Sequence, residues 1–205
     1  MAHPQDLLIA AVDVGGRANI GWSTSDGDGD TGNMTIDELV AQLGSGLEDG
    51  RSVALGVEAP LYLPIAETEE AINSQRAGEG NRSWSASSGS SVATLGIHQL
   101  AYILRKLKDV NAECPTPRFG RPDVGDELSF TVWEAFVSGD AKGDDHEQDA
   151  RIAINHLVNR LNDAEWQSDL RPSGTVVNIA AAATLATWPE ADPSLMTSAC
   201  AVVKA

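Results

Sequence analysis

The chain has 205 residues, of which 42% are hydrophobic and 21% are charged. This length is typical of a single domain and is enough to bury a core without disulfide bonds. The 30 acidic residues outnumber the 14 lysines and arginines, which gives a net charge of −16 at pH 7. Such a charge repels long polyphosphates and argues against a broad electrostatic interface with duplex DNA.

Two further features bear on the cellular location. The N-terminal segment has neither the basic region nor the long apolar region of a signal peptide, and no apolar run approaches the roughly 20 residues of a membrane-spanning helix. Cys114 and Cys200 do not form a CxxC motif. Their spacing leaves a single disulfide open, but two reduced thiols are expected. We therefore expect one domain over residues 1–205, located in the cytoplasm and not associated with a membrane.

The first part of the chain alternates buried strands with turns and one helix. A continuous apolar run that ends at Asp13 is typical of a central strand. Thr35 and Glu38 have the spacing of a capping box, which predicts that a helix begins there. Strands are expected at 7–13, 19–24, 32–36 and 52–57, and the helix at 36–47.

The second part of the chain is mainly helical. Residues 78–91 are rich in Gly and Ser and are expected to form a loop. Helices are expected at 67–71, 92–108, 144–161 and 176–188, and a strand at 128–137. Strands mixed with helices in this order predict an α/β domain built around a mixed sheet.

Three predicted strands end, or nearly end, in a carboxylate: Asp13, Glu58 and Glu134. Ionised carboxylates are costly beside apolar runs because burial removes their hydration. If these strands are neighbours, the three acids converge, and a hard divalent cation such as Mg²⁺ or Mn²⁺ would relieve their repulsion. The alternative is that each is an ordinary strand-terminal acid in a very acidic protein.

Three segments resemble a known family. The segment LLIAAVDVGGRANIGWS resembles the first hairpin of ribonuclease H-like domains, and VALGVEAPLYLP and FTVWEAFVSG are similar to later strands of the DUF429 family of predicted ribonuclease H-fold nucleases. The resemblance implies a mixed sheet of three antiparallel and then two parallel strands, with helices on both faces. It also implies a metal-dependent nuclease site with Asp13, Glu58 and Glu134 as catalytic residues and metal ligands.

The chain departs from the family at one position. The family pattern closes with a helix of the form H-D-x-x-D-A-x-x-A-A, whose acid completes the metal site. The stretch VVNIAAA corresponds to it, and this places Asn178 at the acid's position, where its carbonyl could still ligate a cation. Asp145, His146 and Asp149 could supply the missing group instead, if their helix faces the site. Otherwise they form a solvated first turn, which acids favour through the helix dipole.

A loop near the second acid carries candidate substrate-binding residues. Arg76 and Arg82 could bind a phosphate, and Trp84 could stack on a base. Alternatively, Trp84 covers the edge of the core and the arginines balance local acids.

Two main functions follow from these patterns. The first is a metal-dependent nuclease or phosphodiester hydrolase that acts on small or single-stranded nucleic acid, and a hydrolase of small phosphate esters would share its site. The alternative is a non-catalytic binding or assembly module, such as a homodimer, that keeps the fold.

Overall fold

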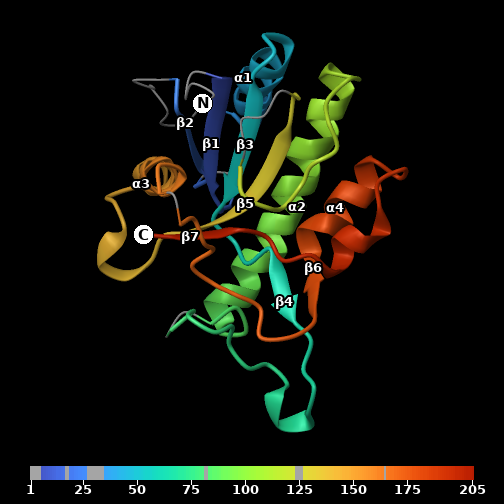
Figure 1. Ribbon diagram of the computed structural model, residues 1–205. Coiled ribbons are helices and arrows are strands. Elements are labelled where there is room, and N and C mark those ends of the chain that lie inside the picture. The colour runs from blue at the N-terminus through green and yellow to red at the C-terminus, as the bar shows by residue number, and fades with distance from the viewer. Residues whose placement is uncertain (1–5, 17–18, 27–34, 81–82, 123–126, 164) are drawn as a thin grey trace.

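The computed structural model describes residues 6–16, 19–26, 35–80, 83–122, 127–163 and 165–205 (Figure 1). The strands are β1 (Leu7–Asp13), β2 (Gly21–Thr24), β3 (Ser52–Val57), β4 (Tyr62–Pro64), β5 (Phe130–Phe136), β6 (Val176–Asn178) and β7 (Val202–Lys204). The helices are α1 (Ile36–Glu48), α2 (Ser87–Val110), α3 (His146–Leu161) and α4 (Ile179–Thr187), with 3₁₀ turns η2 (Glu69–Ala71), η3 (Gly139–Ala141) and η4 (Pro193–Thr197).

The main sheet is mixed and has the strand order β2-β1-β3-β5-β7. β2 is antiparallel to β1, whereas β3, β5 and β7 continue the sheet in parallel. The α/β class is therefore confirmed, but the expected series of three antiparallel and then two parallel strands is wrong for the described sheet. Residues 32–34 of the expected third strand lie outside the described residues, and Ile36 already belongs to α1.

Helices cover both faces of this sheet, as expected (Figure 1). The side chains of its strands alternate between two hydrophobic clusters, one on each face. In β1, Leu8 and Val12 pack on the side of α1 and α2, whereas Ile9 and Ala11 pack on the side of α3. Every residue of β1 and β3 is buried, which explains their continuous apolar sequences.

The helix starts follow their capping residues. The capping box of Thr35 and Glu38 is present at the start of α1, as predicted. Asp145 caps α3 by accepting a hydrogen bond of 2.8 Å from the Gln148 N–H. α2 begins five residues before the predicted Val92, inside the segment that was expected to be a loop. Its first turn packs tightly on that loop, because a Cβ at Gly89 would lie 2.3 Å from the Ser83 carbonyl oxygen.

Two errors concern the C-terminal part of the chain. Residues 176–178 form β6 rather than the start of a helix, because they pair with β4 in a small antiparallel sheet. β7 was not predicted, since a strand of three residues in a small-residue tail has no periodic signal. It pairs with the end of β5 and forms the edge of the main sheet opposite β2.

Candidate metal centre

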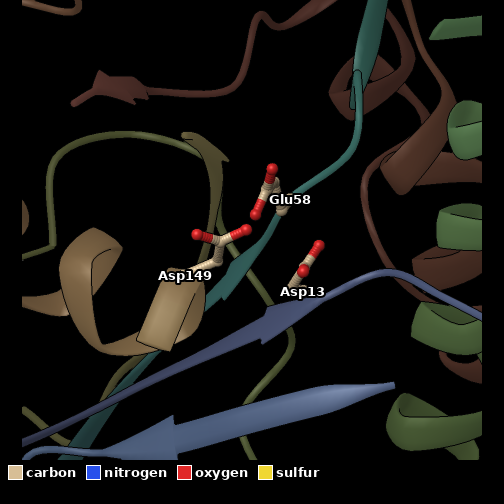
Figure 2. A group of neighbouring side chains, drawn as sticks. All are labelled: Asp13, Glu58 and Asp149. Carbon is tan, nitrogen blue, oxygen red and sulfur yellow. The ribbon is translucent and has the colours of Figure 1, made fainter. Parts of the chain in front are cut away.

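Three carboxylates meet where the parallel strands β1 and β3 end. Asp13 is the last residue of β1, Glu58 directly follows β3, and Asp149 lies in the first turn of α3. One oxygen from each side chain lies within 4.8 Å of the other two. Figure 2 shows the three side chains pointing toward one another from these separate elements.

The register of the parallel strands brings the first two acids together. Val12 pairs with Val57, so the next residues, Asp13 and Glu58, leave the sheet at the same level. α3 then delivers Asp149 from the face on which it packs. Gly21 in β2 permits this approach, because a Cβ there would lie 2.4 Å from the carbonyl carbon of His146.

Polar groups around the cluster hold the carboxylates in place. Lys142 Nζ donates to Glu58 Oε1 at 3.0 Å and to Asp149 Oδ2 at 2.6 Å. The N–H of Gly143 donates to Asp149 Oδ1 at 2.7 Å, and Nδ1 of His146 is hydrogen-bonded to Asp13 Oδ2. Asp149 is therefore fixed through both oxygens.

The three acids repel one another, and Lys142 offsets only part of this repulsion. Burial and the neighbouring charge of Asp13 raise the pKa of Glu58 to about 8, against the opposing effect of Lys142. Burial alone would lower the pKa of Lys142, but the hydrogen bond to Asp149 and the charge of Glu58 raise it above its ordinary value. Oε2 of Glu58 is buried and has no hydrogen-bond partner among the described residues. Glu58 therefore has one oxygen available to ligate a cation, and the acidic groups of the site outnumber its single lysine.

Glu134 does not join this cluster. Val57 pairs with Glu134 across β3 and β5, so the residue level with Glu58 is Ala135. The alternation of side chains then directs Glu134 to the opposite face of the sheet, the side of α2. It is fully buried there and binds the guanidinium of Arg76 through two hydrogen bonds of 2.6 and 2.7 Å.

The predicted substrate-binding residues have mainly structural contacts. Arg76 is buried between Glu79 and Glu134, so its guanidinium does not face a substrate. Burial disfavours its charge, but the two carboxylates raise its pKa above the ordinary value. The indole N–H of the half-buried Trp84 donates to the Ser74 carbonyl at 3.0 Å. The third predicted residue, Arg82, lies outside the described residues.

Asn178 is the N-cap of α4, and its side chain is engaged in that role. Its Oδ1 accepts from the Ala181 N–H at 2.9 Å, and its Nδ2 donates to the Ser198 carbonyl at 2.7 Å. Both ends of the buried amide are therefore occupied by backbone groups. Asp149 contributes the third acid instead, as the alternative assignment allowed.

A sequence signal for Asp149 did exist. The segment from Asp149 to Ala153 has the D-A-x-x-A spacing of that closing pattern, with Asp149 at the acid's position, although Asp145 and His146 stand in the reverse order of its H-D pair. The three candidates of this segment have distinct roles in the structure. Asp145 caps the helix, His146 bonds to Asp13, and Asp149 joins the cluster.

The fold and the site define an α/β domain with a cluster of buried acids at the carboxyl edge of its parallel strands, and this cluster could hold a metal ion. Comparison of the chain with protein-family models, with curated proteins and with solved structures gives no match in any of the three. In the described part of the chain, no helix is both long and apolar enough to span a bilayer.

Proposed function

We propose that the chain is a divalent-cation-dependent phosphodiester hydrolase of ribonuclease H-like fold. The observation that carries this proposal is the convergence of Asp13, Glu58 and Asp149, whose ligand oxygens lie within 4.8 Å of one another. Asp13 and Glu58 also line a pocket. The antiparallel pairing of β2 with β1, followed by parallel β3 and β5, supports the fold assignment. Cytoplasmic location and a nucleic-acid partner stay predictions.

The donor set suits Mg²⁺ or Mn²⁺. All three side chains offer hard oxygen ligands, and Oε2 of Glu58 is buried without a hydrogen-bond partner among the described residues. A bound divalent cation would supply Lewis-acid activation of water and of the phosphate ester.

The surrounding residues position the ligands for this task. The Gly143 N–H fixes one oxygen of Asp149, and His146 fixes one oxygen of Asp13. These outer contacts restrict the rotation of both carboxylates, as outer hydrogen bonds do in metal sites generally. Lys142 neutralises part of the charge and is 41% exposed, so its ammonium can reach an incoming anion.

Hydrolysis assays test this proposal directly. Bis(4-nitrophenyl) phosphate and a short single-stranded oligonucleotide would be offered with Mn²⁺ or with EDTA. We expect hydrolysis that requires Mn²⁺ and falls by about 100-fold or more in Asp13→Asn and Asp149→Asn. The matched control is Asp144→Asn, which removes the same charge from an exposed residue close in sequence. Equal rates in all four proteins would refute the proposal.

One observation favours a second candidate function. Lys142 already binds two of the three acids, so the cluster is partly neutralised without a cation. A non-catalytic binding or assembly module would need no bound cation at this cluster. It predicts no stabilisation by Mn²⁺ and, for a homodimer, a molecular mass in sedimentation equilibrium of twice that of the chain.

A further inference from the structure

A pocket opens beside the acidic cluster, where the ends of β1, β3 and β5 face the first turns of α2. Its volume is about 290 Å³. Its charged end consists of Asp13, Glu58, Lys142 and His146. Its apolar walls include Val14, Ala59, Pro60, Val92, Phe136 and Val137.

We propose that this pocket binds a small phosphate ester that carries one flat apolar group about the size of a nucleoside. The phosphate lies at the charged end, within reach of Lys142, and the apolar group lies between Val92 and Ala59. This inference rests on the proposed function, because it assigns the substrate class of the same site.

The size of the pocket argues for one compact ligand. Ligand pockets in proteins commonly measure about 300–1,000 Å³, so this pocket is at the small end of the range. The mixture of apolar walls with a few charged groups at one end is the usual composition of a site for a small molecule. A flat ring system would bury its faces against the walls and leave the phosphate at the carboxylates.

The charge of the pocket argues against a polymer. Lys142 is the single lysine or arginine among the described residues that line it. A nucleic-acid strand needs a series of cationic contacts along its backbone, and the net charge of −16 repels the phosphates beyond the site. One lysine is sufficient for a single phosphate group.

The walls are set by close backbone packing. A Cβ at Gly96 would lie 2.4 Å from the Cβ of Ala59, so this glycine lets α2 lie directly against the segment that follows β3. Val92 is one helical turn before Gly96 and is half-buried in the pocket wall. A pocket held in this way is largely formed before the ligand arrives, which lowers the cost of binding.

Calorimetric titration with three probes tests the inference in the presence of Mn²⁺. The probes are inorganic phosphate, thymidine 5′-monophosphate and a short single-stranded oligothymidylate. We expect the mononucleotide to bind at least about tenfold more tightly than inorganic phosphate, because it buries apolar area, and the oligonucleotide to bind no more tightly. Val92→Phe should remove the tenfold gain by filling the pocket. Leu95→Phe adds a ring to the same helix at a residue that is 43% exposed and outside the pocket lining, and should keep the gain.

The outcomes separate this inference from the proposed function. Tighter binding of the oligonucleotide, or a mononucleotide affinity that is the same in Val92→Phe and Leu95→Phe, would overturn the inference while Mn²⁺ binding stands. Failure of wild type to bind Mn²⁺ in a separate calorimetric titration with the metal alone would refute the proposed function itself.

Discussion

Lys142 Nζ lies 2.6 Å from Oδ2 of Asp149, and this contact ties the segment after η3 to the first turn of α3. The same ammonium also donates to Glu58, so one cationic side chain bridges two of the proposed metal ligands. A divalent cation that bound these oxygens would compete with Lys142 for them. The affinity of the site for a metal should therefore depend on the lysine.

Replacing Lys142 by methionine should weaken the metal-free protein and strengthen its response to metal. In EDTA we expect a loss of about 1 kcal/mol in the free energy of unfolding, since the pair is partly exposed. Mn²⁺ should bind more tightly than in wild type in calorimetry well above pH 8, because the loss of Lys142 removes a charge that lowers the pKa of Glu58. Lys106→Met on α2 is the control. An unchanged or weaker Mn²⁺ affinity in Lys142→Met would contradict competition.

The raised pKa of Glu58 predicts a pH dependence of the metal-free protein. Between the ordinary value of 4.5 and about 8, the folded state keeps a proton that the unfolded state has lost. The free energy of unfolding in EDTA should therefore fall as pH rises through this window. Glu58→Gln should flatten the fall, whereas Glu48→Gln, at an exposed residue of α1, should not. Parallel stability curves for wild type and Glu58→Gln would disprove the assignment.

Arg76 is expected to matter for stability rather than for substrate. Its guanidinium bridges Glu79 and Glu134 in the core, so Arg76→Met would leave buried charges without a partner. We predict a loss of about 3–5 kcal/mol in urea unfolding. Arg105→Met, at an exposed residue of α2, should cost less than about 0.5 kcal/mol.

If Arg76→Met fails to fold, Arg76→Lys keeps the charge and tests the same contact with a smaller loss. A loss below about 1 kcal/mol in Arg76→Met, combined with weaker binding of thymidine 5′-monophosphate, would restore the substrate-binding interpretation.

Gly21 is predicted to control the placement of Asp149. Its added Cβ in Gly21→Ala would lie 2.4 Å from the carbonyl carbon of His146 and would push the start of α3 away from β2. We expect a loss of about 1–3 kcal/mol in unfolding free energy, together with weaker Mn²⁺ binding. Gly16→Ala is the matched control, because its Cβ would meet no atom within 4 Å. Full Mn²⁺ affinity in Gly21→Ala would show that the approach of α3 is not critical.

Much of the fold could be predicted from local sequence patterns. The apolar runs of β1 and β3 and the capping box of α1 each act over a few residues, and the structure contains them where they were expected. β6 and β7 depend instead on pairing with distant strands, which leaves little trace in their own three-residue sequences.

The site was predictable only in part, because its third acid comes from helix α3 and the exclusion of Glu134 depends on strand register. Asp13 and Glu58 follow buried strands, and this alone indicated their convergence. Glu134 also follows an apolar run, but its register with Val57 places it one residue short of the cluster and on the other face. The D-A-x-x-A spacing from Asp149 to Ala153 was a better guide than the alanine-rich helix that begins after Asn178.

Thermal unfolding in EDTA and in millimolar Mn²⁺ tests the central claim most directly. Wild type and Asp144→Asn should gain stability with Mn²⁺, by about 2.7 kcal/mol at a hundredfold excess over Kd, because the cation binds only the folded state. Asp13→Asn and Asp149→Asn should lose this gain, since each removes one of the three converging carboxylates. An equal melting temperature of wild type in both buffers would contradict a metal centre at this cluster. So would a stability gain with Mn²⁺ that persists in Asp13→Asn.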